Sequence, residues 1–510
     1  MHLKDAVVAD TNHRFRLLLF GCSNGDVVSY HLDDTSGALI QTFRVALTVK
    51  NGPELSGRLG PIRSLRVLPQ NGAFAVVWES GGTRDKKNNG INNASASVPP
   101  PPSSSPSTSS TSASSSSSLP PVSAVFSPLG SQLWCSLESK EEHGEGTDEA
   151  TYNSIEWGPE GYQMWMGGTR GASVLNMVRS SAFGNPYMEH SDRVVLIGSQ
   201  RIYISPLRSR EASASSPHSV WSNIEMRPEY LHANWPIRYA SLDHTDGRVL
   251  VVAGTCGLSF CALSNQRWKI FGNESQERDL HVTGGLFVWS GVMVGACAET
   301  KIKLYPIDTR LDERFASTKE TDARIISSNL KGDTLVTLDA ESRLLLYTLS
   351  RDVPNERDGY AKANIERTAE IRIGELIPHI ACLVSIHLTV LTYDKATSAV
   401  FVPGVDTVLL NVSGRLITLS PKAPTREEPG GHSEDEENRF QLNQPMTIAS
   451  FVEQVWHDRA IERGLDDRMK DENPLRNALW INCGARGSHV WLPLFPGRSR
   501  SGTISVHTSS

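Results

Sequence analysis

The stretch that decides the fold is Leu17-Leu18-Leu19-Phe20, followed by the turn residues Ser23-Asn24-Gly25-Asp26 and by Val27-Val28-Ser29-Tyr30. Two short runs of apolar and β-branched residues joined by a turn with Asn and Gly predict an antiparallel hairpin. The same pattern recurs along the chain, at 62–78, 154–166, 239–263, 325–349 and 408–419. Short antiparallel strands repeated in units of roughly 40 residues are typical of β-propeller blades.

We therefore predict an all-β fold, a divergent WD-repeat-like β-propeller that is possibly incomplete and carries disordered inserts. No repeat shows the Gly-His and Trp-Asp signatures of WD repeats, so the blade count stays open. One segment has an alternative to strand. Residues 450–463 can place Phe451, Val455 and Trp456 on one helical face, and the charged run to Asp471 fits either a helix or a solvated loop.

Composition divides the chain into blades and linkers. From Thr83 to Val122 the sequence is dominated by Ser, Pro, Asn and Thr, which cannot bury a core, and 421–440 is an acidic linker. A linker is the better interpretation of the proline run at 99–102 than a ligand for an aromatic groove. The predicted divisions are propeller blades at 1–82, a disordered insert at 83–122, blades at 123–420, the linker at 421–440, terminal strands and a possible helix at 441–496, and a disordered tail at 497–510.

Charge and cysteine content exclude several classes of function. The 510 residues include 50 Lys and Arg and 56 Asp and Glu, a net charge of −6, so no global positive field exists to hold nucleic acid or an anionic membrane. The 7 cysteines are odd in number and scattered, which favours a reducing compartment over a disulfide framework. The first ten residues lack the apolar run of a secretory signal.

Two uncharged stretches approach the length of a membrane span, 282–298 and 376–393. Gly284, Gly285 and Gly291 interrupt the first, which therefore reads as a strand, a tight turn and a second strand. The second contains Pro378 and His387 among β-branched residues. We predict buried sheet for both.

Enzyme motifs are not found. Gly167-Gly168-Thr169-Arg170-Gly171 lacks the lysine of a phosphate-binding loop and is better interpreted as a strand-end turn. Cys256 and Cys261 could place two thiols near a metal, but further ligands are missing and buried packing is the better interpretation. We predict no catalytic, cofactor-binding or metal-binding residues and no cofactor. The eleven tryptophans, Trp157, Trp235, Trp268 and Trp491 among them, are expected to be packing anchors.

Several long, unusual strings resemble the ribosome control protein 1 family, the large WD-repeat subunit of a Golgi Rab exchange factor. They occur in the family's order and cover most of the chain outside the linkers. They are Phe20-Gly21-Cys22 with Ser36-Gly37-Ala38, Trp157 to Tyr162, Tyr230 to Tyr239, Arg267 to Glu274, Val282 to Leu286, Ala478 to Gly484 and Val490 to Pro496.

The resemblance implies a non-catalytic subunit that pairs with an arrestin-like partner, reduced growth phenotype protein 1. Together they would promote GDP release from a Rab-six-type GTPase in endosome-to-Golgi retrograde transport. The implied location is cytoplasmic and peripheral on the Golgi membrane, with membrane association through partners. Two alternatives remain: a propeller scaffold of a vesicle coat or tether without exchange activity, and a propeller enzyme, which would need acidic or histidine side chains converging on the central channel.

The chain also departs from that family. Its relatives carry a propeller region before the start of this sequence and a helical region after its end, so we expect a fragment or a shortened form. The glycine pair after Trp78 leads directly to the next strand in the family, whereas Gly81-Gly82 here precedes the Ser/Pro insert and the strand resumes at Val125. Which residues would contact a GTPase or partner is not evident from the sequence.

Overall fold

The computed structural model describes residues 5–33, 36–45, 47, 59–80, 122–137, 152–168, 171–186, 193–206, 221–243, 247–297, 300–352, 361–391, 400–422, 441–457, 478–492 and 502–506. In these residues the chain forms nine antiparallel sheets, eight of four strands and one of three. Strands follow chain order within every sheet, which is the up-and-down topology of propeller blades. The all-β prediction is confirmed.

The first four sheets occupy the N-terminal half. Their strands are β1 (Ala6–Asn12), β2 (Leu17–Cys22), β3 (Val27–Leu32) and β4 (Leu39–Val45); β5 (Leu59–Val67), β6 (Phe74–Ser80), β7 (Val122–Phe126) and β8 (Gln132–Cys135); β9 (Tyr152–Trp157), β10 (Gln163–Gly168) and β11 (Gly171–Asn176); and β12 (Arg179–Ser180), β13 (Val195–Ile197), β14 (Arg201–Ile204) and β15 (Ser222–Glu225).

Five further sheets follow in the same manner. They are β16 (Tyr239–Leu242), β17 (Val249–Ala253), β18 (Leu258–Ala262) and β19 (Arg267–Lys269); β20 (Val282–Trp289), β21 (Val292–Cys297), β22 (Lys301–Pro306) and β23 (Ser317–Glu320); β24 (Ile325–Lys331), β25 (Thr334–Asp339), β26 (Arg343–Arg351) and β27 (Ala363–Arg372); β28 (Leu383–Thr389), β29 (Thr407–Val412), β30 (Arg415–Leu419) and β31 (Met446–Ser450); and β32 (Gln454–Trp456), β33 (Leu479–Asn482), β34 (Ser488–Leu492) and β35 (Gly502–Val506).

The hairpins expected from the sequence form at the expected places. Leu17 pairs with His31 across β2 and β3, and the uncharged stretch at 282–298 folds as β20, a turn at Ser290-Gly291 and β21. The stretch at 376–393 contains the buried strand β28. In the described part of the chain, no helix has both the length and the apolar character that crossing a bilayer requires.

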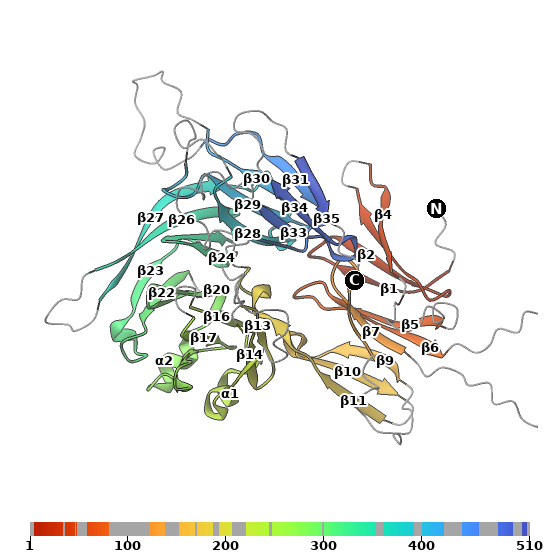
Figure 1. Ribbon diagram of the computed structural model, residues 1–510, viewed down its shortest axis with the longest axis horizontal. Coiled ribbons are helices and arrows are strands. Elements are labelled where there is room, and N and C mark those ends of the chain that lie inside the picture. The colour runs from red at the N-terminus through yellow and green to blue at the C-terminus, as the bar shows by residue number, and fades with distance from the viewer. Residues whose placement is uncertain are drawn as a thin grey trace, which may run out of the picture.

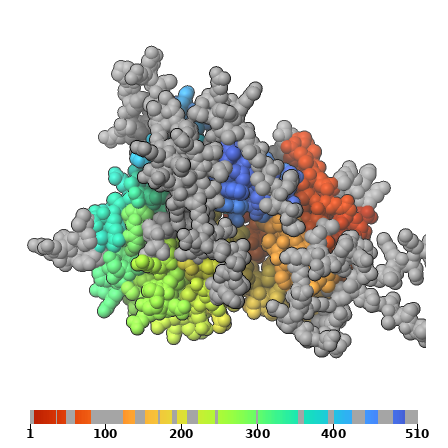
Figure 2. Space-filling view, in the orientation of Figure 1, coloured from red at the N-terminus to blue at the C-terminus, as the bar shows by residue number. Residues whose placement is uncertain are grey.

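Successive sheets pack through their first strands, which line the inside of the arrangement. β1 contacts β5, β5 contacts β9, and the contacts continue from β16 to β20, β24 and β28. Figure 1 shows the sheets following one another around the molecule in chain order, so that the last sheet, in blue, lies beside the first, in red. The space-filling view shows the same order of colours around one face (Figure 2).

Long-range contacts join the last two sheets to the first two. Ser413 donates its hydroxyl to the Arg14 carbonyl at 3.2 Å, and Arg486 donates to the Thr42 carbonyl at 2.9 Å. The Glu453 carboxylate accepts from the Ser127 hydroxyl and the Leu129 amide, both at 2.7 Å. These bonds connect residues more than 300 positions apart, and they hold the ends of the series of sheets together.

The predicted boundaries need three corrections. Val122, predicted to belong to the insert, is the first residue of β7 and pairs with Trp78 of β6. The insert therefore connects two paired strands of one sheet. Gly502–Val506, placed in the disordered tail, forms β35 because its backbone pairs with β34. Gln454–Trp456, for which a helix was also considered, forms β32, the first strand of the last sheet. Val455 pairs with Ile481 and is buried among residues of the last two sheets.

The other predicted linkers lie largely outside the described residues. The Ser/Pro insert before Val122, the linker residues 423–440, the charged run at 458–477 and the remainder of the tail belong to this group. Both ends of the acidic linker are nevertheless placed, since Pro421 bridges to Leu442 and Lys422 donates its amide to the Gln441 carbonyl at 2.7 Å.

Two short helices were not foreseen. α1 (Pro228–Asn234) begins with proline at its first turn, and α2 (Glu274–Asp279) begins after Asn273, whose side chain accepts from the Ser275 amide. Short 3-10 turns lie at η3 (Pro159–Gly161), η4 (Ser181–Phe183), η6 (Glu313–Phe315), η7 (Ile380–Cys382) and η8 (Gly484–Arg486). Both helices connect strands rather than cover a sheet face, and so the fold class is unchanged.

Candidate functional site

Residues 184–186, which follow η4 directly, form hydrogen bonds with the inner strands β20 and β24. The Asn185 side chain donates to the Leu286 carbonyl at 2.8 Å and accepts from the Leu286 amide at 2.9 Å. Asn329 of β24 donates to the Pro186 carbonyl at 2.6 Å. A side chain at Gly184 would meet the Arg238 carbonyl and the Tyr239 ring at 3.0 Å. The segment 184–186 therefore lies tightly against β16, β20 and β24.

His387 lies on β28, an inner strand that contacts β24. It is 2% exposed, and its ring nitrogens meet the Ser385 hydroxyl at 2.9 Å and the Asn329 amide at 3.4 Å. Burial, assisted by the nearby His457, lowers the pKa of His387 to about 3. The ring is neutral at pH 7, and its bonds to an amide and a hydroxyl give it a structural role.

Arg14, in the turn between β1 and β2, joins sheets that are distant in the chain. Its guanidinium donates to the Gln70 carbonyl at 2.6 Å and to the Val384 carbonyl at 2.7 Å, and lies 5.8 Å from the centre of the Phe183 ring. Burial lowers its pKa. Its hydrogen bonds run to backbone carbonyls, so the residue links the first, second and eighth sheets.

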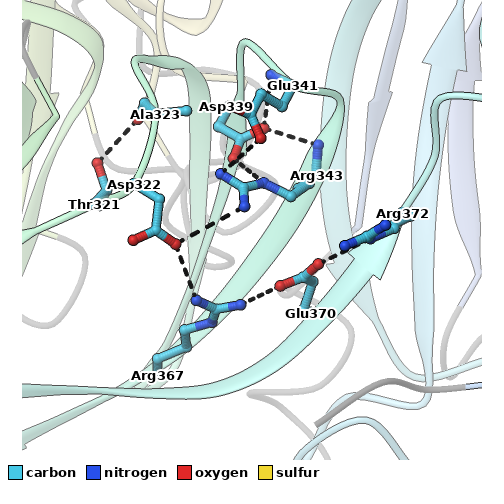
Figure 3. A network of polar contacts seen from close by, with 9 residues as sticks. All are labelled: Thr321, Asp322, Ala323, Asp339, Glu341, Arg343, Arg367, Glu370 and Arg372. Atoms are coloured by element: carbon cyan, nitrogen blue, oxygen red, sulfur yellow. Dashed lines mark hydrogen bonds and ion pairs between the residues drawn. The ribbon is translucent and has the colours of Figure 1, made fainter. Parts of the chain in front are cut away.

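An ion-pair network covers part of the sheet β24–β27 (Figure 3). Asp339, which is fully buried, accepts from the backbone amides of Glu341 at 3.0 Å and Arg343 at 2.9 Å, and from the Arg343 guanidinium at 2.7 Å. Asp322 connects Arg343 to Arg367, at 3.9 Å and 3.4 Å.

The network continues along β27. Arg367 pairs with Glu370, whose other oxygen pairs with Arg372 at 3.2 Å. At the end of the network beside Asp322, the Thr321 hydroxyl donates a hydrogen bond to the Ala323 carbonyl at 3.0 Å. Each of the three arginines pairs with at least one carboxylate, and Arg343 pairs with Asp322, Asp339 and Glu341. This arrangement fixes the turn from β25 to β26.

The two cysteines considered as metal ligands lie in different surroundings. Cys261 is buried in β18, and burial raises its pKa to about 11. Cys256 lies in the preceding turn, with its thiol 3.1 Å from the Asn234 amide oxygen. Among the residues that the structure describes, no group of three or more His, Cys, Asp or Glu could hold a metal ion.

The four tryptophans named as anchors all pack against core clusters. Trp491 is 5% exposed, Trp235 and Trp268 lie partly buried against the cluster around Ile197 and Leu250, and Trp157 lies against the cluster around Ile155. Trp268 also donates to the Glu225 carbonyl at 2.9 Å. That they are anchors rather than ligand contacts stays a prediction.

An exposed apolar pair that sequence reasoning did not select lies on the third sheet, and the pair Leu32 and Leu39 on the first sheet is exposed as well. Trp165 of β10 and Val174 of β11 are cross-strand partners on the face of their sheet that points away from the core, and they are 51% and 47% exposed. The opposite face, with Met164 and Met166, packs against β6 and β7. The glycine-rich stretch after Trp165 was correctly interpreted as a turn, since Gly168 pairs with Gly171 across the hairpin.

Comparison with known proteins identifies the fold's family. Residues 191–509 match the family model described as the RIC1 second beta propeller domain. The chain belongs to the RIC1 family. The match covers β13 to β35, the sheets from the fourth to the ninth, and these are the sheets that carry the network around Asp339 and His387.

Curated relatives in the RIC1 family extend over the remaining sheets as well. A guanine nucleotide exchange factor subunit of Caenorhabditis elegans is 38% identical over 546 residues, covering 98% of this chain and 34% of the relative. Human RIC1, named a guanine nucleotide exchange factor subunit, is 26% identical over 96% of this chain and 35% of its own length. The chain thus spans about a third of the length of the curated relatives it matches.

A solved structure, the Swd1 beta-propeller domain of Myceliophteria thermophila, also matches, with 9% identity and a TM-score of 0.26 over 96% of this chain and 97% of that one.

Proposed function

We propose that this chain forms a propeller part of a guanine nucleotide exchange factor subunit. Its family membership carries this proposal, together with alignments that run over 96% to 98% of the chain to relatives named as such subunits. Exchange factors bind the nucleotide-free GTPase more tightly than the loaded form and need no covalent chemistry. The neutral, hydrogen-bonded His387 and the closely packed segment 184–186 are consistent with such a role.

The finer assignment is a proposal as well. The GTPase is a Golgi Rab of the Rab-six type, the partner subunit is arrestin-like, and the complex acts in endosome-to-Golgi retrograde transport. The chain would be cytoplasmic and reach the Golgi membrane as a peripheral protein through its partners. The net charge of −6 supports this route, because the chain as a whole offers no positive field for anionic lipid.

Copurification tests the proposal. The tagged full chain is expressed with the arrestin-like subunit, and separately with an unrelated arrestin-fold protein as the matched control. We expect a stable complex with the first and none with the second. A chain that instead isolates with a vesicle-coat or tether complex, and never with the arrestin-like subunit, would favour the alternative of a scaffold without an exchange role.

A further inference from the structure

One sheet lacks a strand that all the others have. The sheet β9–β11 has three strands, whereas the other eight described sheets have four. β9 contacts the inner strand β5, so the position without a strand is the outer one, next to β11. The chain leaves β11 at Asn176 and begins β12 of the next sheet at Arg179, without supplying an outer strand in between.

Among the residues that the structure describes, no strand pairs with the outer edge of β11. The Met177 amide donates to the Tyr162 carbonyl at 2.8 Å, which continues the pairing of β11 with β10. Because backbone groups in an antiparallel pair point alternately toward and away from the partner strand, Ala172, Val174 and Asn176 direct theirs to the other side. In the described part of the chain, β11 pairs with β10 alone.

The sequence of β11 lacks the usual protection of such an edge. Its residues, Gly-Ala-Ser-Val-Leu-Asn, include neither a charge nor a proline. Edge strands commonly carry charged residues that oppose pairing with other chains. The outer strands β19 and β23 follow this rule, with Arg267 and Lys269 in the first and Lys319 and Glu320 in the second. The outer strands β8 and β31 are uncharged like β11, but each of them is already the fourth strand of its sheet.

The exposed face beside the edge carries apolar side chains next to polar ones, because Glu156 of β9 is the other cross-strand partner of Trp165 and the pair Gln163 and Asn176 lies on the same face. Trp165 and Val174 form one cross-strand pair on it, and Val178, in the connection to the next sheet, is 51% exposed. A strand added to β11 would place every second side chain on this same face. An apolar residue there would cover Val174 and part of the Trp165 ring.

We propose that β11 accepts an extended segment of a partner chain as the fourth strand of its sheet, by β-strand addition. The segment would be about five residues long, free of proline at its pairing positions, with apolar side chains at alternate positions. A single missing strand favours a single donor. Two copies of this chain pairing edge to edge would instead make a six-stranded sheet, beyond the four that the other sheets have. This inference rests on the proposed function, because the chain that donates the strand is taken to be a member of the same exchange-factor complex.

A peptide-binding experiment tests this on the full chain. The probe is a fluorescein-labelled peptide of about eight residues, alternating Val and Thr with a terminal Lys, and fluorescence anisotropy measures its binding. Ala172→Pro removes an edge donor while leaving pairing with β10 intact, and Val174→Lys adds a charge to the edge without a backbone change. Ile40→Lys on β4, a position 53% exposed, is the matched control.

We expect saturable binding that both β11 variants weaken about tenfold or more and that Ile40→Lys leaves unchanged. Hydrogen exchange of the free chain should show rapid exchange at Val174 and Asn176, slowed by the peptide. Four results would overturn the proposal: no saturable binding, binding insensitive to both variants, slow exchange at these amides in the free chain, or a dimer that Val174→Lys dissociates. No GTPase is present in these measurements, so they are independent of any failure of the exchange function.

Discussion

Removing the Asp339 side chain leaves the Arg343 guanidinium without its buried ion-pair partner. The Asp339 carboxylate accepts three hydrogen bonds, one from the Glu341 amide and two from Arg343, whose side chain is 14% exposed. Asp339→Ala should lower the free energy of unfolding by about 3 kcal/mol, because it leaves a buried guanidinium partly uncompensated. Chemical denaturation measures the loss.

Glu341 provides the matched control. It pairs with the same Arg343 at 3.3 Å, but its side chain is 63% exposed. Exposed ion pairs contribute about 0 to 1 kcal/mol, so Glu341→Ala should change stability little. Equal losses in the two variants would show that the buried turn is not what the network stabilises.

His387 should make stability depend on pH. Its folded pKa of about 3 lies below the ordinary histidine pKa of 6.5, so at pH values between these two the unfolded chain binds the additional proton. Stability therefore falls as pH decreases from about 6.5, by at most about 1.4 kcal/mol per pH unit from this group. His387→Gln should reduce that slope in denaturation measured from pH 7 to pH 5. An unchanged slope in this variant would contradict the structural role assigned to the histidine.

Individual hairpins were predictable because their signals are local. The turn of Ser23 to Asp26 and the alternation on either side of it lie within a few residues, and β2 and β3 form as expected. The pairing of Glu453 with Ser127, or of Asn185 with Leu286, depends on residues brought together only by the closed arrangement of sheets. The strand β35 has no stronger sequence signal than a loop and forms through pairing with β34.

The insert between β6 and β7 should be dispensable for folding. Trp78 and Val122 pair directly at its two ends, and the cost of loop closure rises by only about 0.6 kcal/mol per doubling of length. Replacing residues 83–119 by a few glycines should leave the melting temperature nearly unchanged. A decrease of many degrees would mean that the insert contributes to the packing of the blade.

The tryptophans of the sheets should separate into two classes. Trp491→Ala removes a side chain that is 5% exposed and packs in the last sheet, so it should cost about 3 to 5 kcal/mol of stability. Trp165→Ala, at a position 51% exposed, should cost far less and should weaken binding of the alternating Val/Thr peptide. A Trp491→Ala protein that keeps its stability but loses its partner subunit would contradict the anchor assignment.

At the level of the whole molecule, the sheets form one series whose ends are in contact, and the contacts of Arg14, Ser413 and Arg486 maintain it. The sequence indicated a propeller but not how the first and last sheets meet, because no local pattern records contacts such as Arg486 with Thr42. The candidate binding edge was likewise not predictable. Its defining feature is the position of a fourth strand, which is filled in the other eight described sheets and is not filled by any described strand in this one.

The central claim is that this chain is a propeller part of an exchange-factor subunit, and that exchange depends on surfaces contributed by other chains as well. The chain spans 34% to 35% of the length of its exchange-factor relatives, and the open edge of β11 offers a place where a partner chain could add a strand. Release of fluorescent GDP from Golgi Rab proteins tests the claim most directly. With the purified chain alone, GDP release should stay at the intrinsic rate of each Rab, and the assembled complex of a full-length relative should accelerate it. Substantial acceleration by the chain alone would show that the exchange site lies wholly within Met1 to Ser510 and would contradict this account.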